Sequence, residues 1–293
     1  MSLIEPVGTE LVFAGQPYRD LQPRPRRIHG VDFSGAVDAG WKIWIASGSV
    51  DEDCLRIEDC RRAEDLPGSG KPLDRCLPAL RELIAGETHG VFGLDFPFGL
   101  PDDLVRNYGD WDQFVLDFSK RYPGPKDFRQ DCFEQADHHE RKRATDRENA
   151  APFAAYNLKL YRQTYYGIRD VLAPLVRERR AYVLPMQSAH SGRPWLVEIC
   201  PACTLKKEHL YLSYKGTSMD RREARAYILA AIERIAPLVI PDKDLRARII
   251  ADAGGDALDS VIAAVATFRS IPRMIDGYTG KQMPYPLEGF IFV

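Results

Sequence analysis

The chain has 293 residues, of which 45% are hydrophobic and 28% charged, and its formal net charge is −2. This composition excludes a disordered chain, and no apolar run reaches the roughly 18 residues that a membrane helix requires. The nearly balanced charge neither suggests nor excludes nucleic acid as a ligand, because a local basic groove can lie on a neutral protein.

The amino-terminal residues 1–26 predict a peripheral arm that leads into a domain spanning residues 27–270. The arm lacks a basic segment followed by an apolar core, so we expect no signal peptide and a cytoplasmic protein. The six dispersed cysteines are then expected to be free thiols. The single C-x-x-C of Cys200 and Cys203 has no second cysteine pair or spaced histidine pair to complete a zinc site.

Three strands are predicted in a row at the start of the domain, over residues 27–33, 41–48 and 54–59. The first carries Asp32 close to its end, where Ser34 and Gly35 supply a tight turn. An amphipathic helix over residues 72–86 follows, with Gly86 as its C-terminal cap. The next apolar strand ends on a second carboxylate, Asp95.

A three-strand meander, a crossover helix and a returning strand are the opening of a ribonuclease H-like α/β fold. We therefore expect a mixed sheet of strand order 3-2-1-4-5, flanked by helices. Right-handed crossover connections make strands one and four neighbours in this arrangement, which would bring Asp32 and Asp95 together.

Residues 102–180 predict a largely helical insertion, with helices over 103–121 and 156–180. Its charged stretch, residues 121–147, fits a solvated lid better than an arm that contacts nucleic acid, and both interpretations stay open.

The last part of the domain supplies three more acids. Strands are predicted at 182–184 and 195–199, and the second carries Glu198 near its end. A helix capped by Ser218 follows, then a short helix at 242–252 and a helix of small apolar residues suited to close packing on a sheet. Asp256 and Asp259 share one face at the start of that helix, where the helix dipole stabilises carboxylates. The tail, residues 271–293, ends in a predicted edge strand.

Five acids are thus predicted to converge, four of them aspartates: Asp32, Asp95, Glu198, Asp256 and Asp259. Crowded carboxylates repel one another, so such a set is tolerated mainly when divalent cations neutralise it, and oxygen ligands favour Mg²⁺ or Mn²⁺. Two such ions can activate a water and stabilise the leaving oxygen in phosphodiester hydrolysis. Each acid alone also has a structural explanation, such as capping a helix or, for Glu198, pairing with an arginine.

Four motifs, taken in order, resemble those of domain-of-unknown-function family 429, described as predicted nucleases with a ribonuclease H-like fold. They are residues 30–35 (GVDFSG), 93–101 (GLDFPFGLP), 197–201 (VEICP) and 256–260 (DALDS). The resemblance implies a ribonuclease H-like or resolvase-like metal site on the five acids. It also implies phosphate contacts from Lys215 and Arg221.

The leading hypothesis is therefore a nuclease, a divalent-metal-dependent phosphodiester hydrolase acting on DNA or RNA. One alternative is an ATP-binding enzyme of the actin, heat-shock and sugar-kinase superfamily, which shares the core fold but needs two such domains. Another is a non-catalytic binding protein of the same fold. The sequence favours no particular oligomeric state.

Overall fold

The computed structural model describes residues 26–277 and 282–293, so the predicted arm lies outside the described residues except for Arg26. Its centre is one mixed sheet of eight strands in the order β5-β6-β4-β1-β2-β3-β7, with β8 also paired to β6. The strands are β1 (Arg27–Asp32), β2 (Trp44–Asp51), β3 (Cys54–Arg62), β4 (Gly90–Leu94), β5 (Tyr182–Leu184), β6 (Trp195–Ile199), β7 (Leu238–Val239) and β8 (Ile291–Phe292).

The predicted order of the first four strands is confirmed. β1 and β2 are antiparallel, as are β2 and β3, whereas β4 runs parallel to β1 on its other side. The strand next to β4 is β6, which is also parallel to β4, and β5 lies on the far side of β6. The predicted order, in which the fifth strand adjoins the fourth, is therefore wrong at this position. The predicted tail strand is present as β8, and β7, which was not predicted, extends the sheet beside β3.

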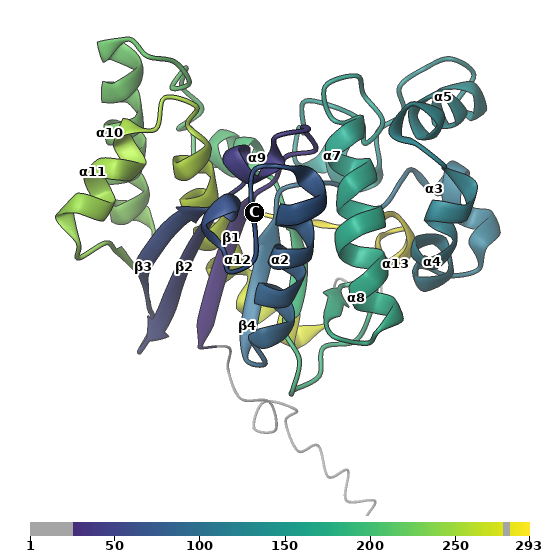
Figure 1. Ribbon diagram of the computed structural model, residues 1–293, viewed down its shortest axis with the longest axis horizontal. Coiled ribbons are helices and arrows are strands. Elements are labelled where there is room, and N and C mark those ends of the chain that lie inside the picture. Colours follow the sequence, from purple (N-terminus) through teal and green to yellow (C-terminus); the bar gives the residue numbers. More distant parts are fainter. Residues whose placement is uncertain (1–25, 278–281) are drawn as a thin grey trace, which may run out of the picture.

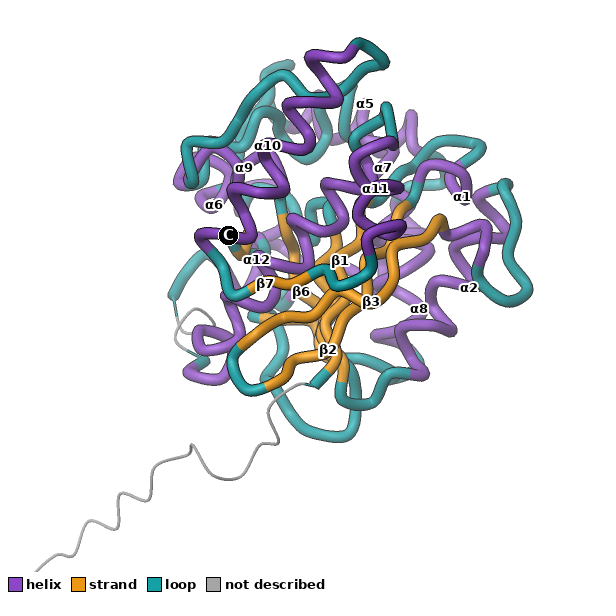
Figure 2. The backbone as a smooth tube through the Cα atoms, turned by 90° about the vertical axis from the view of Figure 1, so that its left-hand side faces the viewer, coloured by secondary structure: helices purple, strands orange, loops and turns teal. Residues whose placement is uncertain are grey.

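Helices cover both faces of the sheet (Figure 2). One face is covered by α9 (Pro201–Lys207), α10 (Met219–Ile235), α11 (Lys243–Ala251) and α12 (Asp256–Asp276). The other is covered by α1 (Ala39–Lys42), α2 (Leu73–Gly86), α4 (Trp111–Arg121), α7 (Tyr161–Tyr166), a π-helical segment (Gly167–Leu172) and α8 (Ala173–Arg177). The remaining helices are α3 (Asp102–Val105), α5 (Pro125–Gln135), α6 (Ala144–Glu148) and α13 (Tyr285–Glu288), and two 3₁₀ turns (Ala63–Asp65 and Arg106–Tyr108) complete the fold (Figure 1).

The predicted small-residue helix packs against the sheet as α12, at very close range. A Cβ atom on Gly30 of β1 would overlap main-chain atoms of Ser260 and Ala264, and one on Gly93 of β4 would overlap the Thr267 hydroxyl. Glycine at these two positions lets the helix backbone approach the strands more closely than any side chain would allow. The start of α12 is thereby set directly against the ends of β1 and β4.

Several predicted helix limits differ from the observed ones. The helix predicted over 103–121 is interrupted at Gly109, whose positive φ of 77° ends the first part, and α4 begins after the Asp110 cap. The helix predicted over 156–180 starts at Tyr161, ends at Arg177 and contains a π segment just before Pro174, whose missing N–H removes one helical hydrogen bond. α12 continues past the predicted domain limit at residue 270 because Ile271 and Met274 are still buried.

The cysteine prediction is wrong for one pair. Cys200 and Cys203 form a disulfide, whereas Cys54, Cys60, Cys76 and Cys132 are free. Within the part of the chain that is described, no helix combines the length and the apolar character needed to cross a membrane.

Candidate active site

Two of the predicted acids lie side by side at the carboxyl ends of β1 and β4. Val31 pairs with Leu94 across these parallel strands, and the backbone N–H of Asp95 donates to the Val31 carbonyl at 3.0 Å. Asp32 and Asp95 therefore follow neighbouring strands at one edge of the sheet, as expected. Asp32 is 9% exposed and Asp95 is partly exposed, so solvent reaches both side chains.

The first turn of α12 brings two more acids to the same place. Asp259 is buried, and its carboxylate accepts a 2.6 Å hydrogen bond from the Tyr214 hydroxyl. The Lys215 ammonium lies 2.8 Å from Asp259 Oδ2 and 3.2 Å from Asp256 Oδ1. We refer to Asp32, Asp95, Asp256 and Asp259 as the aspartate cluster.

Crowding in the aspartate cluster changes the proton affinity of its members. The pKa of Asp32 is raised well above its usual value, first by loss of hydration and then by the charges of Asp259 and Asp256. The pKa of Asp95 is raised to about 8, again by loss of hydration and then by repulsion from Asp259. Loss of hydration also raises the pKa of Asp259, although Lys215 and Tyr214 oppose the rise. Full ionisation of the cluster would therefore place more negative charge there than its surroundings neutralise, and protons are retained instead.

The carboxylates of Asp32 and Asp95 differ from ordinary buried acids in a second way. No described residue donates a hydrogen bond to either carboxylate, and the only nearby cation that lowers their pKa values is Lys215. Their oxygens are not among the buried side-chain atoms that lack a partner in the described residues, so they are open to solvent or to a ligand, and two such carboxylates side by side indicate a ligand-binding position.

Glu198 lies on the opposite face of the sheet from α12, although its charge still contributes to the raised pKa of Asp95. Glu198 pairs with Leu94 of β4. Leu94 belongs to the part of the core on the α2 side of the sheet, as do Val31 and Leu196. Val197 and Ile199, which flank Glu198 in β6, face α12 instead. Because side chains alternate along a strand, Glu198 points away from α12 and from Asp259.

Both carboxylate oxygens of Glu198 take part in a buried ion pair. The fully buried Arg143 guanidinium donates to both Glu198 oxygens, through Nη1 at 2.8 Å and through Nη2, and it also contacts Asp146. The backbone N–H of Phe98 donates to Glu198 at 2.9 Å. Glu198 therefore anchors the loop that follows Asp95. This is the arginine pairing named above as a structural explanation for Glu198, and the arrangement gives no support to its predicted role as a metal ligand.

The two predicted basic positions act differently: Lys215 lies on the loop before α10, and Arg221 lies in the first turn of α10. Lys215 neutralises Asp256 and Asp259, yet 52% of its side chain is exposed. Loss of hydration lowers the pKa of Lys215, but the surrounding aspartates outweigh this effect and raise it. Arg221 instead donates to the Ser213 carbonyl at 2.5 Å, and the buried Arg225 donates to the carbonyls of Tyr214 and Gly216. Two arginines therefore hold the loop that carries Tyr214 and Lys215.

The described residues fit a hard cation by donor chemistry but are not arranged around one. The cluster offers carboxylate oxygens, two of them unpaired, which are the ligands that Mg²⁺ and Mn²⁺ prefer. No group of three or more His, Cys, Asp or Glu side chains in residues 26–277 and 282–293 is placed so that it could hold a metal ion. Lys215 supplies the positive charge at Asp256 and Asp259 instead.

Sequence reasoning missed Tyr214 and Arg143. Tyr214 directly precedes Lys215, but no pattern shows that its hydroxyl reaches Asp259. Arg143 belongs to the charged stretch 121–147, where a buried residue is not distinguishable from its solvated neighbours.

Comparisons with known proteins do not assign this site to a family. No family model matches the chain, and neither a curated protein nor a solved structure matches it.

Proposed function

We propose that the chain is a divalent-metal-dependent phosphodiester hydrolase that acts on nucleic acid through the aspartate cluster. The observation that carries this proposal is the meeting of Asp32, Asp95 and Asp259 from three separate elements, with negative charge that Lys215 only partly neutralises. A ribonuclease H-like fold is part of the proposal. The strand order β3-β2-β1-β4-β6, with an antiparallel meander and parallel additions, supports it.

In this proposal Asp32 and Asp95 would be the first ligands of Mg²⁺ or Mn²⁺, and Asp256 and Asp259 would join them in place of their contacts with Lys215. When bound, the ion would lower the pKa of a water and neutralise charge on a phosphate oxygen. Tyr214 holds the Asp259 carboxylate in one orientation through its hydrogen bond. Lys215 reduces the repulsion within the cluster, and its half-exposed side chain can also reach a phosphate. The Glu198–Arg143 pair fixes the loop after Asp95.

A titration of divalent ions, followed by thermal unfolding, tests the proposal. Mg²⁺ or Mn²⁺ should raise the melting temperature of the wild type, because a ligand that binds only the folded state stabilises it. Asp32→Asn and Asp95→Asn should lose this response. Asp127→Asn, at an exposed site on α5, is the matched control and should keep it.

A cleavage assay on labelled single-stranded and double-stranded DNA and RNA then tests the activity. We expect divalent-dependent cleavage by the wild type and by Asp127→Asn only. Absence of any metal response in the wild type, or the same response in both cluster variants, would overturn the proposal. Stabilisation by ATP in place of the metal alone would favour the ATP-binding alternative.

A further inference from the structure

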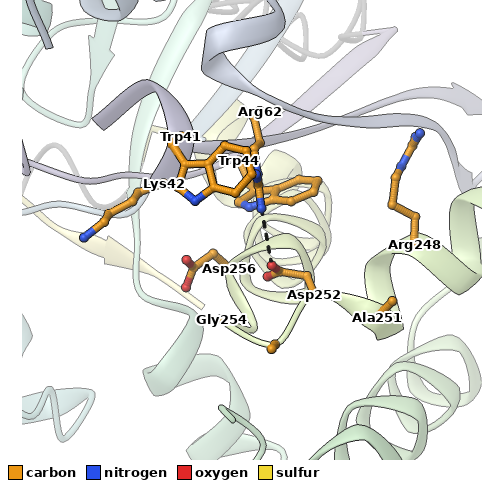
Figure 3. A pocket seen from close by; sticks show the side chains of 10 residues that line it. Trp41, Lys42, Trp44, Arg62, Arg248, Ala251, Asp252, Gly254 and Asp256 are labelled. Carbon is orange, nitrogen blue, oxygen red and sulfur yellow. Dashed lines mark ion pairs between the residues drawn. The ribbon is translucent and has the colours of Figure 1, made fainter. Parts of the chain in front are cut away.

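A cavity of about 620 Å³ lies at the start of α12, and its lining includes Asp256 of the aspartate cluster (Figure 3). Its principal lining residues are Trp41, Trp44, Arg62, Arg248, Asp252 and Asp256, and we call it the Trp41–Arg62 cavity. Its volume lies in the range of pockets that hold small organic ligands. Asp256 belongs to both the cavity and the cluster, because its carboxylate also contacts Lys215.

Strand register explains why the cavity adjoins the cluster. Trp44, the first residue of β2, pairs with Asp32 on one side, and with Arg62, the last residue of β3, on the other. Residues paired across strands point to the same face of a sheet. Asp32, Trp44 and Arg62 therefore form a row across one end of the sheet, facing the start of α12.

The cavity combines exposed aromatic surface with an oriented planar cation. The centre of the Arg62 guanidinium lies 3.2 Å from the Trp41 ring centroid and 4.9 Å from that of Trp44. Trp41 nevertheless remains 45% exposed, although large aromatic side chains are usually buried. Arg62 Nε is buried, and no described group accepts its hydrogen bond. Arg62 Nη2 lies 3.9 Å from Asp252 Oδ1, so the guanidinium is held beside the Trp41 ring, and the exposed part of the indole is the surface available to a ligand.

Positive charge predominates around this aromatic surface. Lys42, Arg62 and Arg248 line the cavity together with two acids, Asp252 and Asp256. The Lys71 ammonium adds a further charge 5.0 Å from the Trp41 ring. A ligand with a flat ring and an attached anion matches both properties, because the ring can stack on the indole and the anion can pair with the cations.

We propose that the Trp41–Arg62 cavity binds one unpaired nucleotide of a single-stranded DNA or RNA, with its base on Trp41 and its phosphate at Arg62. The adjoining phosphodiester then lies towards the aspartate cluster. This inference rests on the proposed function for the identity of the ligand. Single strands are bound by such aromatic and cationic pairs, whereas the bases of a duplex are already stacked on each other and present no free face to Trp41.

Binding is measured by fluorescence anisotropy of short labelled oligothymidylate and oligouridylate in EDTA, so that the metal plays no part. Stacking on one aromatic side chain contributes about 1–3 kcal/mol, so Trp41→Ala should weaken binding by about 5- to 150-fold. Trp41→Phe should retain part of the affinity. Arg62→Met should weaken binding and lower the salt dependence by about one ion.

Two exposed positions on α10 provide matched controls. Tyr227→Ala removes an exposed aromatic ring and Arg222→Met an exposed guanidinium, and both should bind like the wild type. A blunt duplex of the same length should bind the wild type more weakly than either single strand. Comparing oligothymidylate with oligouridylate shows whether DNA or RNA is preferred.

The outcomes separate this inference from the proposed function. Unchanged binding by Trp41→Ala, or equal binding of duplex and single strand, overturns the inference even if metal-dependent cleavage is found. Binding that depends on Trp41, without any response to a metal ion, supports nucleotide binding in the cavity and overturns the proposal of a metal-dependent nuclease. Circular dichroism of each variant confirms that a loss of binding does not come from unfolding.

Discussion

Asp95→Asn should stabilise the metal-free protein, and increasingly so as the pH rises. The pKa of Asp95 is raised to about 8 in the folded state, whereas an exposed aspartate has a pKa near 4. Between these values the folded protein keeps a proton that the unfolded chain has released, so stability falls as pH increases through this window. Asparagine has the same size and no charge, so the variant does not experience this loss.

The size of the effect follows from the same linkage. About 1.4 kcal/mol per pH unit over about four units gives an upper limit of about 5.6 kcal/mol above pH 8. Water reaching the partly exposed carboxylate reduces this to about 2–3 kcal/mol. In a chain of this length that corresponds to a rise of about 4–6 °C in the melting temperature.

The assay is thermal or urea unfolding in EDTA, near pH 4.5 and at about pH 8.5. We expect nearly equal stability of Asp95→Asn and wild type at the lower pH and the full gain at the higher pH. Asp127→Asn should change neither value. Saturating Mn²⁺ should reverse the order, because only the wild type gains binding energy. If Asp95→Asn is less stable than the wild type at both pH values, the account of the cluster as uncompensated negative charge is refuted.

Four further results are expected. The Mn²⁺ affinity of the wild type should fall by up to about 10-fold per pH unit below pH 8, because the ion must displace the proton of Asp95, whose pKa is about 8. A Mn²⁺ affinity that does not change with pH in calorimetry would contradict this. Lys215→Met should tighten Mn²⁺ binding several-fold in the same titration, because the competing ammonium is removed. Glu198→Gln should cost about 3–5 kcal/mol in urea unfolding, since it leaves buried Arg143 without its full counter-charge. Gly30→Ala should abolish or strongly weaken folding through its overlap with α12, whereas Gly86→Ala, with open space around it, should change stability by less than about 1 kcal/mol.

The elements that could be predicted are those whose signals are local. β1 and β4 are apolar runs ended by an acid and a turn, and the start of α10 is fixed by the Ser218 cap, which accepts from the N–H of Arg221. The neighbouring positions of Asp32 and Asp95 also follow from local order, because a meander and one crossover leave few ways to place the fourth strand.

The features that could not be predicted depend on which face a side chain takes or on contacts distant in sequence. Glu198 was expected beside the aspartates because it ends a strand, but the alternation along β6 directs it to the other face. The row of Asp32, Trp44 and Arg62 requires the exact register of two strand pairs, which a one-residue slip would change. The Cys200–Cys203 bond depends on a thiol geometry that cysteine spacing alone does not determine.

The close contact between α12 and the sheet has a consequence for how the site adapts. Main-chain atoms of the helix meet Gly30 directly, so the separation between the ends of β1 and α12 has little freedom to change. The Lys215 side chain, by contrast, is half exposed and comes from a loop. We therefore expect the carboxylates to keep nearly fixed positions and so to discriminate between ions of different radius. The Lys215 side chain is expected to change its conformation when an ion binds.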